Sequence, residues 1–283
     1  MNRTMATRTI VEGLAFAEAP RWHGGKLWFS DFYTHKVQCV DENGKLETVV
    51  EVEGQPSGLG WLPDGRLLVV SMHERKLLRL DAPGLTTVAD LGGLAPSHCN
   101  DMVVDRHGRA YVGNFGFDMF NKEPVRPTVL ILVMQDGDAR VVADDLLFPN
   151  GCVITPDQST LIVAETFGNR LTAFDIAPDG SLSGRRVWAE LGEASPDGIC
   201  IDAEGAVWVA SPPTSTFLRV REGGEVVERI AVQNQAIACA LGGEDRRTLF
   251  MVTGRVSKAP RALVERSGRI EVVRVDVPGA GSP

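Results

Sequence analysis

The sequence predicts an all-β protein, a six-bladed β-propeller with four-stranded blades, and three observations support this fold class. Short runs of β-branched and aromatic residues alternate with Gly, Asp, Asn and Pro, whereas helical periodicity is nearly absent. Six of these runs share one layout, and their last residues lie about 41 to 51 positions apart. Short motifs with a polar centre recur in phase with the runs. A β repeat of about 40 to 50 residues is typical of a propeller blade.

The six runs are expected to be the second strands of the blades. Most follow a turn with Gly or Asp, as in a hairpin that joins the first and second strands. Each run is followed by further apolar segments, for example residues 77–81 and 86–89, so that each repeat supplies four strands. The six runs are residues 26–30, 67–71, 110–114, 161–165, 207–211 and 249–253.

The two ends of the chain are expected to close the ring. Residues 8–11 form an extra strand before the first repeat, and we expect it to pair with residues 269–275 of the last blade. Such pairing protects strand edges that would otherwise be open. The whole chain, residues 1–283, is therefore expected to be a single propeller domain.

One insertion, residues 115–127, breaks the period between the second and third strands of the third blade. It carries Phe115, Phe117, Met119 and Phe120, more aromatic and apolar side chains than a thin blade can bury. Loops that interrupt a regular scaffold often shape a binding site. The alternative is a surface loop with a local apolar cluster, and the sequence leaves both interpretations open.

The polar motifs indicate a site on the axis of the ring, because equivalent positions of a closed ring face the same point. Glu18, Asn100, Asn150 and Asp197 would then converge, and their oxygens are ligands that hard divalent cations prefer. Capping of hairpin turns is the alternative role of Asn-Gly and Asp-Gly pairs. Four centres in phase favour the metal site, with Ser57 lining the channel wall. The motifs are Glu18-Ala19-Pro20, Pro56-Ser57-Gly58, Cys99-Asn100-Asp101, Pro149-Asn150-Gly151 and Pro196-Asp197-Gly198.

Composition excludes several classes of function. The net charge is −8 and no Lys/Arg-rich run is present, which argues against nucleic acid or an anionic membrane as a partner. The longest apolar stretch, residues 129–134, is too short to span a bilayer, and the N-terminus has no signal-peptide core. Five cysteines without a Cys-x-x-Cys motif fit reduced thiols in the cytoplasm. We expect a cytoplasmic protein that acts on a small molecule.

The motifs resemble those of the senescence marker protein, gluconolactonase and luciferin-regenerating enzyme family, in order and over essentially the whole chain. The segments that carry the resemblance are residues 18–22, 100–101, 149–151 and 196–202. The resemblance implies a six-bladed propeller with one divalent metal on its axis and the hydrolysis of lactones. It also implies that Glu18, Asn150 and Asp197 bind the metal, that Asn100 contacts substrate or metal-bound water, and that Asp197 is the general base.

The chain departs from the sugar-lactone members of this family at His98, where those members carry Arg. A His with phenylalanines nearby suits a less polar substrate. We therefore predict that Asn100, His98, Asn114, Phe115 and Phe117 bind the substrate, and His98 either protonates the leaving alkoxide or only holds the substrate.

The expected reaction is lactone opening, in which the metal polarises the carbonyl and Asp197, or a metal-bound water that it deprotonates, provides the attack. Oxygen ligands alone are compatible with Ca, Mg, Mn, Fe(II) or Zn. Two alternatives remain: phosphotriester hydrolysis, lyase or cyclisation chemistry on the same metal propeller, or a non-catalytic binding propeller.

Overall fold

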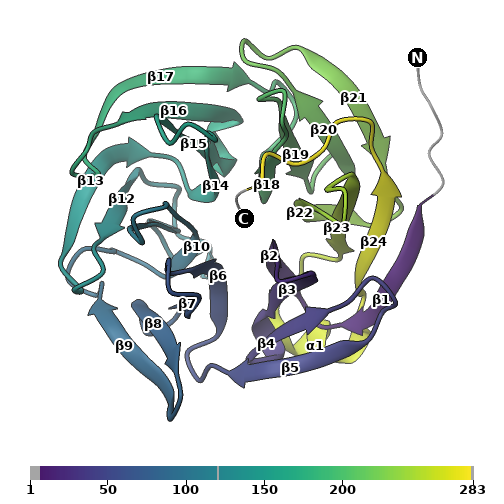
Figure 1. Ribbon diagram of the computed structural model, residues 1–283, viewed down its shortest axis with the longest axis horizontal. Coiled ribbons are helices and arrows are strands. Elements are labelled where there is room, and N and C mark those ends of the chain that lie inside the picture. Colours follow the sequence, from purple (N-terminus) through teal and green to yellow (C-terminus); the bar gives the residue numbers. More distant parts are fainter. Residues whose placement is uncertain (1–6, 120, 282–283) are drawn as a thin grey trace.

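The computed structural model describes residues 7–119 and 121–281, so that Phe120 of the insertion lies outside the described residues. Within them the strands form six four-stranded sheets, which are arranged as the blades of a ring (Figure 1). The first three blades contain β2 (Ala17–His23), β3 (Lys26–Asp31), β4 (Lys36–Val40), β5 (Leu46–Glu51); β6 (Pro56–Trp61), β7 (Leu67–Ser71), β8 (Lys76–Asp81), β9 (Gly84–Asp90); and β10 (Cys99–Val104), β11 (Ala110–Asn114), β12 (Thr128–Val133), β13 (Ala139–Leu146).

The other three blades repeat this meander, and the sixth takes its outermost strand from the N-terminus. They contain β14 (Pro149–Ile154), β15 (Thr160–Glu165), β16 (Arg170–Ile176), β17 (Leu182–Glu190); β18 (Ile199–Ile201), β19 (Val207–Ser211), β20 (Thr216–Val220), β21 (Val226–Ala231); and β22 (Gln235–Gly242), β23 (Thr248–Gly254), β24 (Gly268–Arg274), β1 (Arg8–Leu14).

These strands confirm the predicted fold. Each of the six runs is the second strand of a blade, with ends within one residue of the prediction. The predicted closure is also confirmed, because β1 pairs antiparallel with β24, from Arg8 opposite Val272 to Leu14 opposite Gly268. The insertion leaves the ring between β11 and β12, as expected.

Burial explains why the second strands are short apolar runs. Every residue of β7, β11 and β19 is buried, because neighbouring blades cover both faces of these strands. The outermost strands, such as β9, β17 and β21, have many exposed residues because only one side meets the protein. The core is therefore a set of apolar layers between blades, which fixes the inner strands around the axis.

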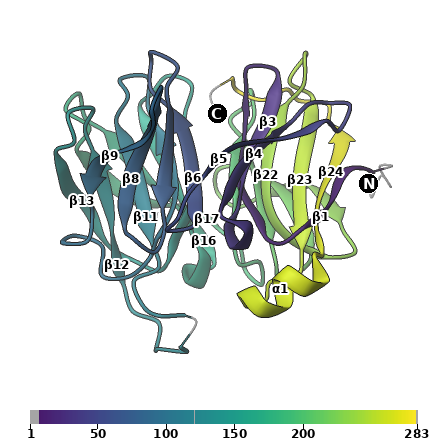
Figure 2. The ribbon, with the colours of Figure 1, turned by 90° about the horizontal axis from the view of Figure 1, so that it is seen from below.

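The two ends of the ring differ. Figure 2 shows the insertion and α1 (Ala259–Glu265) projecting from one end, with the C-terminal segment at the other. The helix α1 was not expected from the sequence, because it has only seven residues and no side-chain cap. Among the described residues, none of the helices is long and apolar enough to cross a membrane.

Candidate functional site

Four of the polar centres, including Glu18, Asn100 and Asn150, lie at β-bulges near the beginning of the inner strands, whereas Asp197 lies just before its strand, β18. The pairing with the second strand shifts register between Glu18 and Arg21, between Cys99 and Met102, and between Pro149 and Cys152. A bulge bends its strand and changes the direction of a side chain. The backbone of Ala19 is also in the left-handed region, with φ 48°. Such local strain is concentrated at functional sites.

Glycines after the polar centres allow neighbouring inner strands to approach closely. A Cβ at Gly151 would lie 2.6 Å from the nitrogen of Ile199, and one at Gly198 would lie 2.3 Å from Cβ of Ala238. The Gly198 amide uses this proximity to donate to the carbonyl of Ile237 at 2.9 Å. In each Asn-Gly or Asp-Gly pair, the glycine thus allows the inner strands to pack closely around the axis, and the residue before it supplies the polar side chain.

The predicted axial residues lie at the end of the ring from which the insertion leaves, since Cys99, next to Asn100, pairs with Asn114 at the start of the insertion. Asn150 Nδ2 donates to Asp197 Oδ1 at 2.5 Å, which joins the fourth and fifth blades. Ser57 Oγ donates to Asn100 Oδ1 at 3.5 Å, which joins the second and third. Glu18 lies within electrostatic reach of Asp197, whose charge acts on it. All are buried except Asp197, which is half-buried.

The two carboxylates at the axis are poorly compensated. Burial and the charge of Asp197 raise the pKa of Glu18 well above its usual value. Burial, with a contribution from Asp101, raises the pKa of Asp197 to about 7, although the hydrogen bond from Asn150 opposes this shift. The nearby guanidinium of Arg21 is engaged by Asp101 at 2.7 Å and by the carbonyl of Met102. Within the described part of the chain, Glu18 and Asp197 form no ion pair.

These features fit a hard cation. Two desolvated carboxylates that repel each other are stabilised by a positive charge, and carboxylate and amide oxygens are its preferred ligands. Asn100 is 5% exposed, and its Nδ2 has no hydrogen-bond partner in the described residues. An orphaned buried amide indicates a bound group, since such atoms are normally satisfied. No group of three or more His, Cys, Asp or Glu in the described ranges is arranged to hold a metal, so the amides are needed to complete the donor set.

Thr166 positions Asn150 and was not predicted from the sequence. Its hydroxyl donates to the carbonyl of Pro196 at 2.8 Å and accepts from Asn150 Nδ2 at 3.2 Å. It begins η2 (Thr166–Gly168), which follows β15 directly. The sequence did not single it out, because it lies in the connection between the second and third strands and not in one of the recurring polar motifs of the inner strands.

A set of contacting rings, here called the aromatic wall, lies next to the axial residues in the chain. It contains the predicted His98 and Phe115, whose ring centroids are 5.8 Å apart, and the predicted Phe117 contacts the wall at Phe148 and Phe167. His73, Phe148 and Phe167 complete it and were missed by sequence reasoning. The wall is formed by His73, His98, Phe115, Phe148 and Phe167.

Asn114 does not join the other predicted substrate-binding residues. Its side chain is fully buried, and its Nδ2 donates to the carbonyl of Val129 at 2.8 Å. Its Oδ1 accepts from the Gly116 amide and from the hydroxyl of Thr128. These bonds tie together the two ends of the insertion, so that Asn114 anchors the loop.

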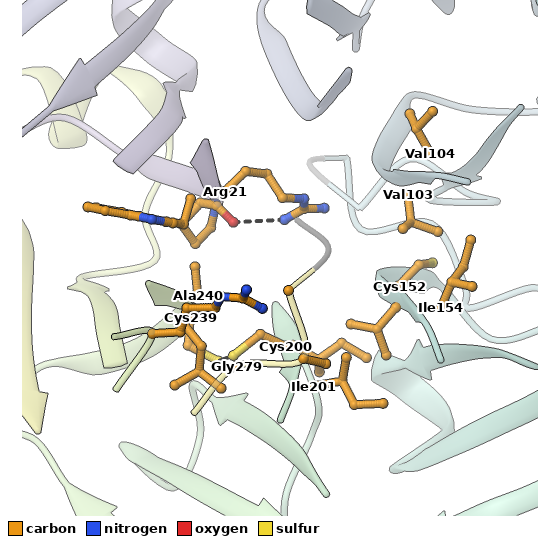
Figure 3. Close-up of a pocket in the computed structure, with 18 of the residues that line it drawn as sticks. Arg21, Val103, Val104, Cys152, Ile154, Cys200, Ile201, Cys239, Ala240 and Gly279 are labelled. Atoms are coloured by element: carbon orange, nitrogen blue, oxygen red, sulfur yellow. Dashed lines mark hydrogen bonds between the residues drawn. The ribbon is translucent and has the colours of Figure 1, made fainter. Parts of the chain in front are cut away.

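A separate cavity of about 330 Å³ lies at the other end of the channel (Figure 3). It is lined by the ends of the inner strands and by the C-terminal segment, including Arg21, Ile154, Cys200, Cys239 and Gly279. The sulfurs of Cys200 and Cys239 lie 3.6 Å apart, and both cysteines are free. None of the predicted site residues lines this cavity. The channel therefore has a front half with the axial residues and a rear half with thiols, apolar side chains and charged residues such as Arg21 and Arg246.

The chain is similar in sequence to proteins of one known family. Residues 16–255 match the family described as "SMP-30/Gluconolactonase/LRE-like region". A protein from Pseudomonas putida named 6-deoxy-6-sulfogluconolactonase is 28% identical over 292 residues, covering 100% of this chain and 99% of the relative. Regucalcin from Xenopus laevis is 26% identical, covering 86% of this chain and 85% of the relative.

The fold is also shared with a solved structure. A regucalcin from Agrobacterium tumefaciens, described as a calcium-binding protein, superposes with a TM-score of 0.83 and 21% identity. The similarity covers 99% of this chain and 97% of that protein. At this identity the likeness establishes the common six-bladed architecture.

Proposed function

Because the chain belongs to the SMP-30/Gluconolactonase/LRE-like family, we propose that it is a divalent-metal-dependent hydrolase that opens lactones. The observation that carries the proposal is the convergence of Glu18, Asn150 and Asp197 at one end of the channel, with two carboxylates that lack a cationic partner among the described residues. The name of the Pseudomonas putida relative, a lactonase, supports this substrate class.

We propose that Glu18, Asn150 and Asp197 hold the cation through their oxygen atoms. When bound, such a cation supplies Lewis-acid polarisation of the lactone carbonyl and stabilisation of the developing oxyanion. Calcium is the first ion to test, because the ligands are all oxygens and the regucalcin from Agrobacterium tumefaciens is described as calcium-binding.

We propose that Asp197 is the general base. Asn150 engages its Oδ1, so that Oδ2 is the atom that accepts a proton from the attacking water. The water oxygen bonds to the carbonyl carbon, the ring C–O bond breaks, and the departing alkoxide takes up the proton that Asp197 accepted, to give a hydroxy acid. Asn100 binds the substrate through the amide nitrogen that has no partner among the described residues, and His98 faces the leaving oxygen.

The free cysteines and the net charge of the chain support a small-molecule substrate and a reducing compartment. All five cysteines are free, which is consistent with the cytoplasm. The net charge of −8 supplies no basic surface for nucleic acid.

The proposal is tested by stripping the purified protein with a chelator and reloading it with Ca²⁺, Mg²⁺, Mn²⁺ or Zn²⁺. We expect lactone hydrolysis only after reloading with a suitable ion, and cation binding by calorimetry. Asp197→Asn keeps the shape of the side chain but removes its charge and its capacity as a base. We expect it to lower kcat by about 100-fold or more and to weaken cation binding by about tenfold or more.

Asp136→Asn is the matched control, because Asp136 is an exposed turn residue of the third blade. It should keep wild-type activity and cation affinity. Full activity of stripped wild-type protein, or of Asp197→Asn, would contradict the proposed function.

A further inference from the structure

We propose that the aromatic wall binds a flat apolar group of the substrate, so that the preferred lactones carry an aromatic or similar ring rather than several hydroxyl groups. This inference rests on the proposed lactonase function and adds the substrate class. It is argued from the continuity of the wall, its position beside the axial residues, its exposed surface and its chemistry.

The rings of the wall form one continuous series of contacts. His73 stacks on His98 with centroids 4.3 Å apart, and His98 meets the face of Phe115 edge-on at 5.8 Å. Phe115 stacks on Phe148 at 4.6 Å, and Phe148 contacts Phe167 at 5.3 Å. Stacked and edge-to-face geometries of this kind hold rings rigidly.

The wall lies directly beside the axial residues. His98 and Phe148 each precede an axial asparagine, Asn100 and Asn150, by two residues. Phe167 follows Thr166, whose hydroxyl accepts a hydrogen bond from Asn150. The wall thus belongs to the second, third and fourth blades, whereas Glu18 and Asp197 come from the first and fifth. A substrate with its carbonyl at the axis therefore has this wall along one side.

Part of the wall is accessible. Phe167 is 42% exposed, His73 is exposed and His98 is half-buried, whereas Phe115, Phe117 and Phe148 are buried and support them. An exposed Phe beside a polar site has a free-energy cost that a bound apolar group would remove. Phe167 is held in place by the connection after β15, where its amide donates to the carbonyl of Leu147 at 3.3 Å.

The chemistry of the wall suits a flat apolar group better than a polyhydroxylated one. Burial lowers the pKa values of His73 and His98, so both imidazoles are neutral at neutral pH and can stack without charge repulsion. Each hydroxyl of a sugar lactone would need a hydrogen-bond partner, and a buried hydroxyl without one is unfavourable. Ring faces supply none of these partners but contact an apolar ring over a large area.

The test compares two six-membered lactones that differ in polarity, dihydrocoumarin and glucono-δ-lactone. We expect metal-loaded wild-type protein to have the higher kcat/KM on dihydrocoumarin. Phe167→Ala should lower kcat/KM on dihydrocoumarin about tenfold, mainly through KM, and more than on glucono-δ-lactone. Val187→Ala is the matched control, because Val187 is an exposed apolar residue, 49% exposed, on the outer strand of the same blade. It should leave kcat/KM unchanged on both lactones.

A second readout separates the wall from the chemistry. Chroman, which has the ring of dihydrocoumarin but no carbonyl, is tested for binding by saturation-transfer NMR. We expect a signal with wild-type and Val187→Ala, and a weaker one with Phe167→Ala. Preference for glucono-δ-lactone with equal losses in Phe167→Ala would overturn the inference. If neither lactone is hydrolysed, the proposed lactonase function fails. Chroman binding that depends on Phe167 would then still support the aromatic wall as a binding surface, and a lack of chroman binding would overturn the inference about the wall.

Discussion

Asn150 shows how a single hydroxyl decides the orientation of an amide. The Thr166 hydroxyl has one hydrogen, which it donates to the carbonyl of Pro196, so it can only accept from Asn150. The neighbour of Thr166 at this contact must therefore be the Asn150 nitrogen, which also donates to Asp197. Asn150 Oδ1, the atom that suits a cation, is left out of both contacts. The amide assignment thus follows from a count of hydrogens.

Replacing Thr166 should weaken cation binding without unfolding the protein. Thr166→Val keeps the shape but removes the acceptor that fixes the Asn150 amide, so we expect the Kd for the cation to rise about tenfold, as for other residues that orient metal ligands. Thr166→Ser restores the hydroxyl and should restore the affinity. Calorimetric titration of the stripped proteins measures both.

Thr214→Val is the matched control, because Thr214 follows β19 as Thr166 follows β15, but its hydroxyl bonds to Ser211. It should bind the cation like wild-type protein. An unchanged Kd in Thr166→Val would show that Asn150 does not need this hydroxyl.

The site residues that the sequence predicted are those that occupy equivalent positions in successive repeats. Glu18, Asn100, Asn150 and Asp197 were predictable because each occupies the same position of a repeat. The structure brings Glu18, Asn150 and Asp197 within interaction range and bonds Asn100 to Ser57. Thr166 and Phe167 belong to the connection between the second and third strands, whose residue types differ from blade to blade, so that no recurring residue marked them. Asn114 carries the right chemistry at a strand end, but the insertion that follows it uses both its amide atoms.

At the level of elements, the strands were predictable because burial on both faces demands short apolar runs. The exceptions are local. The helix α1 follows the last second strand without a capping side chain, so no start signal was present. The bulges at the polar centres are likewise set by the curvature of inner strands around the axis, which the amino-acid pattern does not encode.

The closure strand β1 provides the next prediction. Leu14 is 4% exposed and packs in the apolar core beside Gly268 of β24. Leu14→Ala should reduce the free energy of unfolding by about 2–4 kcal/mol, because it removes buried methyl groups and leaves a cavity. Urea unfolding followed by tryptophan fluorescence measures the loss. Thr9→Ala, at an exposed position of the same strand, should be nearly neutral. Equal stability of the two variants would contradict a stabilising role for the closure.

At the scale of the whole molecule, the two ends of the channel differ in what lies over them. The chain after β24 runs inward over the ring toward the axis (Figure 1). Its backbone bonds to the fifth and sixth blades, through Pro278 to the Ala203 amide at 2.8 Å and through Gly279 to the carbonyl of Arg246 at 2.8 Å. This segment lines the rear cavity, whereas the axial residues lie at the opposite end. The axial residues and the rear cavity therefore lie at opposite ends of the channel.

Removing residues 277–283 should open the rear cavity while the blades remain folded, because Val275, the last buried residue of the core before the cut, is retained. Burial raises the pKa of Cys200 in the intact protein, which keeps the thiol protonated and unreactive. Water that enters the opened cavity should lower that pKa, so we expect the thiol to react with a disulfide reagent about tenfold faster at pH 8. Cys200→Ala in the truncated chain should abolish the fast phase. Equal rates in the intact and truncated proteins would mean that the C-terminal segment does not seal the channel.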